Sequence, residues 1–312
     1  MHKKLKDTEI RALLIRAGLD NTGDIKRIEI GYSNTVYTIA DRYILKIGRE
    51  SDPTGRLERE AFFIDLLKDN LPTPEVLFLD TTRKIIDRPF AFFDKIHGDN
   101  LYAKWHEFST PERKEIFRTI LGYLRAINEA PTKEFISRFD INTSISWKEK
   151  IVSNINAYLI DVNKKQLLPL DFISQIRKYV DKNIQVLNDS KIALTYDDPH
   201  FDNFIVSNKK IVGVLDFETT DLRSIDYVLG LFKRMVDFPT KYVSAESEQY
   251  IKDEDYADLM IWCKEFYPEL FDFKNLDIRL TLYSIGHDLW EYILFGNDRA
   301  KNELARCVGI LQ

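Results

Sequence analysis

The sequence contains little that suits a secreted, membrane-embedded or nucleic-acid-binding protein. Its 312 residues include two cysteines, Cys263 and Cys307, too few for a disulfide framework or a cysteine metal cage. No apolar run approaches the roughly 20 residues of a membrane-spanning helix, and the charged amino terminus lacks the apolar stretch of a secretory signal. A net charge of −5 argues against a dedicated nucleic-acid binder. We therefore expect a cytoplasmic globular protein with no membrane or nucleic-acid partner.

The acidic side chains are concentrated toward the carboxyl end. Residues 1–100 carry 17 basic and 17 acidic side chains, whereas residues 241–300 carry 6 basic and 13 acidic ones. Such a region attracts a cationic substrate or partner. Charge runs also commonly mark a solvated helix surface, so both interpretations stay open.

The hydrophobic pattern changes near Gly98. Before this glycine, short segments rich in Ile, Val and Tyr predict five strands, and apolar residues at helical spacing predict one main helix after a short amino-terminal one. The predicted strands are 25–30, 36–39, 43–47, 75–79 and 90–96, and the predicted helices are 7–18 and 56–68.

After Gly98 helical patterns dominate. They begin at Thr110 and continue over 147–163, 171–187, 246–266 and 276–295, interrupted by one hairpin in which Val206 lies opposite Ile211. The sequence thus predicts an α+β fold with two lobes. The small one, 1–97, has five strands and one main helix, and the larger one, 98–312, is mostly helical, with a hinge near residues 94–98.

The predicted hairpin gathers polar side chains at one end. The pairing of its strands brings Asn203 and Asp216 to the same open end, and Asp198 lies just before it. Crowded carboxylates repel one another, and a hard divalent cation relieves that repulsion. An amide and one or two carboxylates are typical of a site for Mg²⁺.

The first lobe contains two charges in apolar surroundings. Lys46 lies inside an apolar strand, and Glu60 lies in the apolar stripe of the next helix. Because lone buried charges are costly, we expect the two to pair, with the lysine reaching a phosphate. A turn between two strands, residues 31–35, is suited to covering nucleotide phosphates.

In order and spacing, these residues resemble the aminoglycoside phosphotransferase and choline kinase family, distant relatives of protein kinases. The resemblance covers roughly residues 25–235. The interval from Asp198 to Asn203 resembles the family's H-G-D-x-x-x-x-N loop, and Leu215–Glu218 resembles its I-D-F-E segment. The resemblance implies a protein-kinase-like fold. It also implies that Asp198 is the catalytic base, that Asn203 and Asp216 hold Mg²⁺, and that Asp226 steadies the loop structurally.

The resemblance also implies a nucleotide site for ATP or GTP in the first lobe. Lys46 would bind the phosphates with Glu60 as its helix partner, and Phe93 would be the gatekeeper. The other implied contacts are Ser33 and Asn34 over the phosphates, and the backbone of Asp94 and Ile96 at the adenine.

One departure concerns the residues before the catalytic aspartate, Tyr196 and Asp197, where the family has histidine and glycine. In the family, the histidine braces the metal-binding segment that Leu215–Glu218 resembles. A tyrosine would brace this segment differently. Four residues are candidates for contact with the acceptor: His200, Glu265, Asp288 and Glu291.

The function indicated is a kinase that moves the γ-phosphoryl group of ATP or GTP, with Mg²⁺, to a hydroxyl group of a small cationic molecule. Two alternatives stay open. One is a metabolic kinase for choline, a sugar or an amino alcohol, and the other is a pseudokinase that only binds nucleotide.

Overall fold

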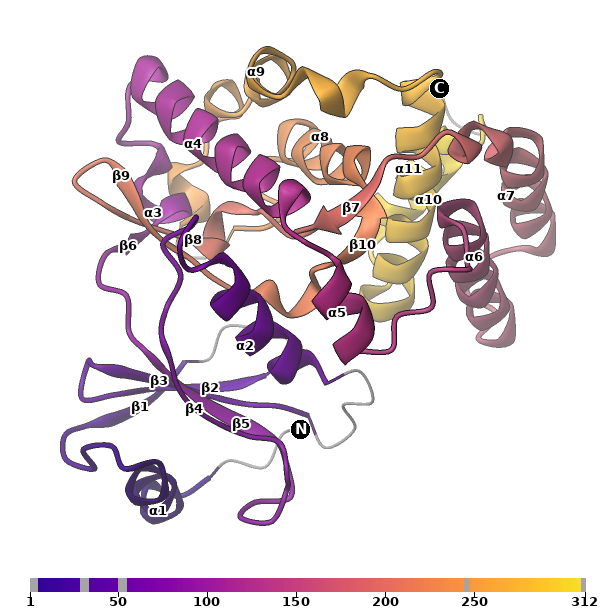
Figure 1. Ribbon diagram of the computed structural model, residues 1–312. Coiled ribbons are helices and arrows are strands. Elements are labelled where there is room, and N and C mark those ends of the chain that lie inside the picture. Colours follow the sequence, from indigo (N-terminus) through magenta and orange to yellow (C-terminus); the bar gives the residue numbers. More distant parts are fainter. Residues whose placement is uncertain (1–4, 29–33, 50–54, 244–246, 310–312) are drawn as a thin grey trace. The chain divides into compact units, whose positions relative to one another are not determined.

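The computed structural model describes residues 5–28, 34–49, 55–243 and 247–309 (Figure 1). The chain forms two compact units. The first consists of Met1–Ala130, Tyr196–Asp221 and Pro239–Tyr256, and the second of Pro131–Thr195, Leu222–Phe238 and Ala257–Gln312. The two predicted lobes, 1–97 and 98–312, stay a prediction.

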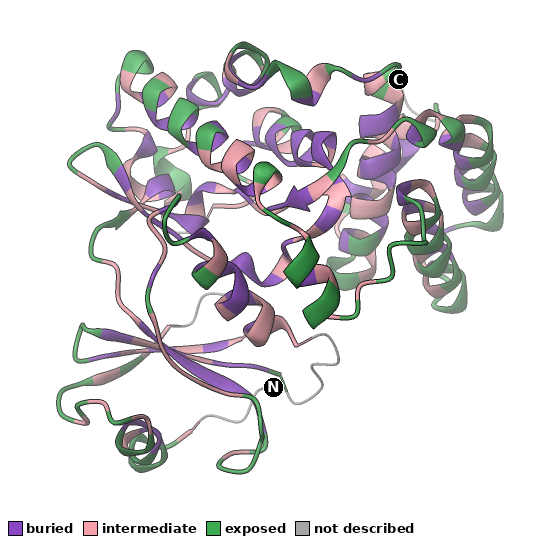
Figure 2. Ribbon diagram, viewed as in Figure 1, coloured by how far each residue is buried: buried purple, intermediate pink, exposed green. Residues whose placement is uncertain are grey.

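The first unit contains a five-stranded antiparallel sheet in the order β1-β2-β3-β5-β4. Its strands are β1 (Ile25–Ile28), β2 (Thr35–Ile39), β3 (Tyr43–Ile47), β4 (Val76–Asp80) and β5 (Phe90–Asp94). Side chains in β2 and β3 are alternately buried and partly exposed, as a half-buried pleated strand requires. All five predicted strands are confirmed, and the interior of β5 is buried (Figure 2).

Two helices cover opposite faces of this sheet (Figure 1). In α1 (Asp7–Ala17), Ile10, Leu13 and Leu14 form one apolar stripe that packs with buried residues of β2, β3 and β5. Tyr43, Leu45 and Ile47 of β3 belong to that core, so the intervening side chains point to the other face. That face carries α2 (Arg56–Leu67), the predicted main helix.

The rest of the first unit surrounds a second, three-stranded sheet in the order β6-β8-β9. Its elements are β6 (Asp99–Asn100), α3 (Leu101–Trp105), α4 (Thr110–Glu129), η2 (Phe201–Asn203), β8 (Phe204–Ser207), β9 (Lys210–Val214), η3 (Phe217–Thr219), η5 (Glu248–Tyr250) and η6 (Asp253–Asp255). Gly98 has a φ of 154°, and a Cβ there would lie 2.7 Å from the carbonyl oxygen of Val206. Glycine therefore lets the chain pass close to this hairpin as it leaves β5.

The β8–β9 hairpin has the predicted register, with Val206 opposite Ile211. Its turn has two residues, because the strands extend to Ser207 and Lys210. Asn208 and Lys209 form the turn, with φ of 49° and 61°, as a two-residue turn of the twisted type requires.

The second unit is mainly helical. Its elements are α5 (Lys133–Arg138), α6 (Trp147–Lys164), α7 (Leu170–Asn183), η1 (Ile184–Asn188), β7 (Ile192–Thr195), β10 (Asp221–Ser224), η4 (Ile225–Val228), α8 (Leu229–Asp237), α9 (Leu259–Phe266), η7 (Pro268–Phe271), α10 (Leu276–Phe295) and α11 (Asp298–Cys307). β10 pairs with β7. Among the described helices, none combines the length and apolar composition needed to cross a membrane.

The predicted helix over 246–266 is wrong for most of its length. The described part of this segment forms two short 3-10 turns before α9 begins at Leu259. The physical reason is tertiary. The indole N–H of Trp105 donates to the backbone carbonyl of Asp255 (2.9 Å), and Arg113 forms a buried ion pair with its carboxylate. These contacts replace helical hydrogen bonds in an acidic stretch whose like charges already disfavour a helix.

Candidate active site

The predicted pair of buried charges lies on the α2 side of the first sheet. Lys46 Nζ, from β3, lies 2.6 Å from Glu60 Oε1, from α2, and the Glu60 side chain is 3% exposed. Burial raises the pKa of Glu60, although Lys46 opposes that shift. Burial alone would lower the pKa of Lys46, but Asp216 and Glu60 raise it. The lysine therefore remains a fixed cation in the site.

The same lysine contacts the loop after the β8–β9 hairpin. Lys46 Nζ lies 3.3 Å from Asp216 Oδ1. Asp216 has a φ of 62°, a left-handed conformation that asparagine and aspartate tolerate better than other side chains. Carboxylate oxygens of Glu60, Asp216 and Glu218 all lie within 4.8 Å of one another. Lys46 and Arg56, which pairs with Glu218, leave one of the three negative charges unmatched, and this excess favours a bound cation.

The loop from Asp198 to Asn203 is closed by its own hydrogen bonds. The Asn203 amide donates to the backbone carbonyl of Asp198 (2.9 Å), and the carbonyl of Asn203 accepts from the N–H of Leu215 (2.9 Å). The second bond holds the loop beside Asp216, as the hairpin register predicted. The predicted base and the two predicted metal ligands therefore belong to one hydrogen-bonded assembly.

The ring of His200, a residue of this loop, packs near two tyrosine rings. Its ring stacks on Tyr102 (6.5 Å between centroids) and on Tyr242 (5.7 Å, 2° between planes). His200 Nε2 lies 3.4 Å from Asp198 Oδ2. Burial alone would lower the pKa of His200, but the Asp198 carboxylate raises it above its ordinary value. The stack thus holds a polar nitrogen beside the predicted catalytic carboxylate.

Tyr196 supports the predicted metal loop, the segment Leu215–Glu218 that contains Asp216. It is 1% exposed, its hydroxyl donates to the backbone carbonyl of Leu215 (2.7 Å), and its ring packs on Phe217 (5.3 Å). Burial raises the pKa of Tyr196 well above its ordinary value, which keeps the hydroxyl protonated as a donor. Leu215 and Phe217 flank Asp216, so the tyrosine holds both neighbours of that residue.

The predicted adenine contacts lie at the end of β5. Phe93 is buried, and its ring centroid lies 5.9 Å from Lys46 Nζ. Asp94 ends the strand, and Ile96 lies in the connection to β6. Asn34 directly precedes β2, whereas Ser33 lies outside the described residues. The nucleotide roles of these residues stay predictions.

Three acidic residues predicted to contact the acceptor belong to the second unit. Glu265 is exposed on α9. Asp288 is 3% exposed and lines a cavity of about 320 Å³ among α8, α10 and α11. Glu291 is buried, accepts from Asn297 (2.8 Å) and pairs with Arg299, so its charge is already matched within the protein. Their contact with an acceptor stays a prediction, and the arrangement favours it least for Glu291.

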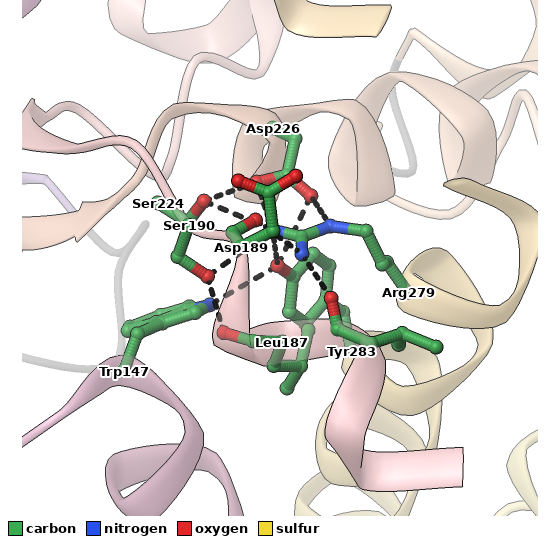
Figure 3. A network of polar contacts seen from close by, with 9 residues as sticks. Trp147, Leu187, Asp189, Ser190, Ser224, Asp226, Arg279 and Tyr283 are labelled. Carbon is green, nitrogen blue, oxygen red and sulfur yellow. Dashed lines mark hydrogen bonds and ion pairs between the residues drawn. The ribbon is translucent and has the colours of Figure 1, made fainter. Parts of the chain in front are cut away.

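Asp226 is the centre of a buried polar network in the second unit (Figure 3). It accepts from Arg279 Nε and Nη2 (2.7 and 2.9 Å) and from the Tyr283 hydroxyl (3.1 Å). Arg279 also donates to the backbone carbonyls of Val186 (2.7 Å) and Asp189 (2.9 Å). The network ties η4 to α10 and η1. The loop-steadying role expected for Asp226 stays a prediction.

The oxygen donors of the first unit suit Mg²⁺. Asp216 supplies a carboxylate that is 37% exposed, and Asn203 supplies an amide oxygen in the adjoining loop. Magnesium prefers such hard oxygen ligands and retains several waters, so few protein ligands are required. The residues present therefore fit this ion.

Sequence reasoning missed three residues of the assembly. Glu218 accepts from Asn34 and Arg56, and Tyr242 stacks on His200. Arg56 precedes Glu60 by one helical turn, a spacing that places both on one helix face and was visible in the sequence. No comparable local signal marks Tyr242, because its partner lies 42 positions earlier in the chain.

Comparison with known proteins gives one family and one fold. The sequence profile described as the phosphotransferase enzyme family matches residues 24–262. A comparison with curated proteins yields no significant match.

Several solved structures share the fold across nearly the whole chain. The ADP-bound aminoglycoside phosphotransferase APH(2'')-Ib has 17% identity and a TM-score of 0.65, with 97% of each chain covered. The gentamicin complex of APH(2")-IIa has 16% identity and a TM-score of 0.66, covering 100% of this chain and 98% of the other. APH(4)-Ia, in a ternary complex of a thermostable mutant with AMP-PNP and hygromycin B, has 15% identity and a TM-score of 0.66, with 97% of each chain covered. The chain thus has the two-lobed, protein-kinase-like α+β fold that the sequence predicted.

Proposed function

This chain belongs to the phosphotransferase enzyme family, and we propose that it moves the γ-phosphoryl group of ATP or GTP to a hydroxyl group of a small cationic molecule. The observation that carries this proposal is the position of Lys46. Its ammonium group bridges Glu60 (2.6 Å) and Asp216 (3.3 Å), residues 14 and 170 positions away. A lysine held by a helix glutamate beside a metal-binding aspartate is the arrangement that positions nucleotide phosphates in kinases.

The predicted base, the predicted metal ligands and the lysine each have a role in this reaction. Asp198 orients the acceptor hydroxyl and accepts its proton as the oxygen attacks the γ-phosphorus, while the bond from that phosphorus to the β,γ-bridging oxygen breaks and ADP or GDP leaves. Asn203 and Asp216 would hold Mg²⁺, and Lys46 would hold the nucleotide phosphates. When bound, Mg²⁺ supplies positive charge that offsets the negative charge on the transferring group. Tyr196 and Glu60 keep Asp216 and Lys46 in place.

The proposed nucleotide-binding residues lie on or next to the five-stranded sheet. The backbone of Asp94 and Ile96 would bind the adenine beside Phe93, and Asn34 would approach the phosphates. Solved structures of this fold contain ADP, ATP with streptomycin, or GDP with kanamycin. Both ATP and GTP are therefore reasonable co-substrates for this chain.

The cationic character of the acceptor rests on the charge around the base. The six residues 197–202, in and next to the predicted catalytic loop, include three aspartates, Asp197, Asp198 and Asp202. Burial is the main cause that raises the pKa of Asp202, the Asp198 carboxylate adds to it, and a nearby amine would favour the charged carboxylate. Solved structures of proteins with the same fold contain the small molecules gentamicin, hygromycin B or kanamycin.

The test is a coupled nucleotide-consumption assay with Mg²⁺ and ATP or GTP. The acceptor panel contains aminoglycosides, choline, sugars and amino alcohols. Loss of a positioned general base costs on the order of 10²–10⁴-fold in kcat, so Asp198→Asn is expected to lose that much turnover. Asp69→Asn, which removes an exposed carboxylate elsewhere on the first unit, serves as the matched control.

Turnover with one acceptor class, lost in Asp198→Asn and kept in Asp69→Asn, would establish the kinase and identify its acceptor. Selective turnover of choline, a sugar or an amino alcohol would favour the metabolic kinase instead. Nucleotide binding without turnover of any acceptor would favour the pseudokinase. Turnover that survives Asp198→Asn would refute the assigned base.

A further inference from the structure

Glu218 is a buried carboxylate to which the reaction described above gives no task. It lies on η3, two residues after Asp216, and is 3% exposed. Both of its oxygens are engaged. Oε2 accepts from the Asn34 amide (2.6 Å), and Oε1 accepts from Arg56 Nη1 (3.3 Å). A buried carboxylate with a hydrogen bond on each oxygen, one of them from a cation, is well compensated for its loss of water.

The Arg56 contact fastens the first turn of α2 to the metal loop. Arg56 is the first residue of that helix, and α2 packs against η3. Arg59 makes a second, longer ion pair with Asp221, which lies three residues after Glu218 (3.8 Å). Glu60, the partner of Lys46, lies one turn beyond Arg56 on the same face. The position of α2 therefore sets the position of the Lys46–Glu60 pair.

The Asn34 contact fastens a second element to the same carboxylate. Asn34 directly precedes β2, and Val36 and Lys46 are register partners in the β2–β3 ladder. Glu218 thus joins two segments that lie 184 and 162 positions away in the chain. One of them contacts Lys46 through the β2–β3 ladder and the other through Glu60 on α2.

We propose that Glu218 is a positioning residue for the nucleotide. It holds the start of β2 and the first turn of α2 on the metal loop, so that Lys46 and Asp216 stay in register for the phosphates. The alternative is a metal ligand, because oxygens of Glu218, Asp216 and Glu60 lie within 4.8 Å of one another. The occupied oxygens argue for positioning. This inference rests on the proposed nucleotide-dependent function.

The experiment measures the dissociation constant of ADP by calorimetry, once with Mg²⁺ and once with EDTA. Glu218→Ala removes both contacts and is expected to weaken ADP binding about tenfold in either condition, the scale of a lost charged hydrogen bond. Glu218→Gln keeps the shape and one oxygen acceptor for Arg56, and its N–H can donate to Asn34 once the Asn34 amide flips, so it is expected to recover part of that loss. An amide is a poor replacement for a metal-binding carboxylate, which makes this rescue diagnostic.

Arg56→Ala and the double variant complete a mutant cycle. If Glu218 acts through Arg56, the double variant binds ADP no more weakly than Glu218→Ala alone. Asp65→Asn removes an exposed carboxylate of α2 that pairs with Lys68, and it is expected to leave ADP binding unchanged. Circular dichroism confirms folding, and if Glu218→Ala does not fold, Glu218→Gln and Arg56→Ala still test the idea.

Two results would overturn the inference. One is unchanged ADP affinity in Glu218→Ala, or in Arg56→Ala if the former is unfolded. The other is a loss seen only with Mg²⁺ and not rescued by glutamine, which would make Glu218 a metal ligand. A wild-type protein that binds no nucleotide in either condition would instead refute the proposed function, and the inference with it.

Discussion

Removing the Tyr196 hydroxyl tests how the metal loop is held. In Tyr196→Phe the ring still packs on Phe217, but the carbonyl of Leu215 loses the donor at 2.7 Å. A buried hydrogen bond contributes about 1 kcal/mol, and a buried carbonyl left without a partner raises the cost, so we expect a loss of about 1–2 kcal/mol. For a chain of 312 residues, with an unfolding entropy of about 2.1 cal/mol/K per residue, that loss lowers Tm by roughly 1.5–3 °C.

Tyr256 provides the matched control. It is 0% exposed, and within the described part of the chain its hydroxyl has no hydrogen-bond partner. Its ring packs near Trp105 and Phe201, contacts that phenylalanine retains. Tyr256→Phe therefore removes a buried polar group without breaking a bond, and it is expected to be neutral or slightly stabilising.

Both variants are compared by thermal unfolding and by calorimetric titration with Mg²⁺ and ADP. We expect Tyr196→Phe to lower Tm and to weaken nucleotide binding, because Leu215 adjoins Asp216, whereas Tyr256→Phe changes neither. Equal shifts in Tm for the two variants would show that the hydrogen bond to Leu215 has no special weight. An unchanged nucleotide affinity in Tyr196→Phe would refute the bracing role.

The remaining predictions concern the second unit. Arg279→Met leaves the Asp226 carboxylate buried without its cation, so urea unfolding is expected to show a loss of about 3–5 kcal/mol, and a loss below 1 kcal/mol would contradict the structure. Burial raises the pKa of the Cys307 thiol to about 12, and that of Cys263 is raised as well. Only the thiolate reacts with disulfide reagents, so at pH 8 we expect labelling of Cys307 to be about 1,000-fold slower in the folded protein than in the unfolded chain. Because the protonated form predominates below the raised pKa, the rate should rise about tenfold per pH unit between pH 8 and pH 10, and rapid labelling at pH 8 would contradict the raised pKa.

Local sequence patterns determined most of the secondary structure and the order of the site residues. The strands at 43–47 and the helix at 276–295 have the predicted bounds, because alternation and helical spacing are set by neighbouring residues. The register of Val206 with Ile211 was also predictable, since a short turn and the strand period leave few pairings. The pairing of Lys46 with Glu60 followed from the cost of burying either charge alone.

Only the tertiary structure decided which distant groups share a hydrogen bond. The donors to Glu218 come from Asn34 and Arg56, and no local pattern links positions so far apart. The segment before α9 is not helical despite its helical sequence pattern, because Asp255 in this segment makes contacts with Trp105 and Arg113. Patterns report the balance of forces over a few residues, whereas these contacts depend on the packing of whole elements, which can outweigh local propensity.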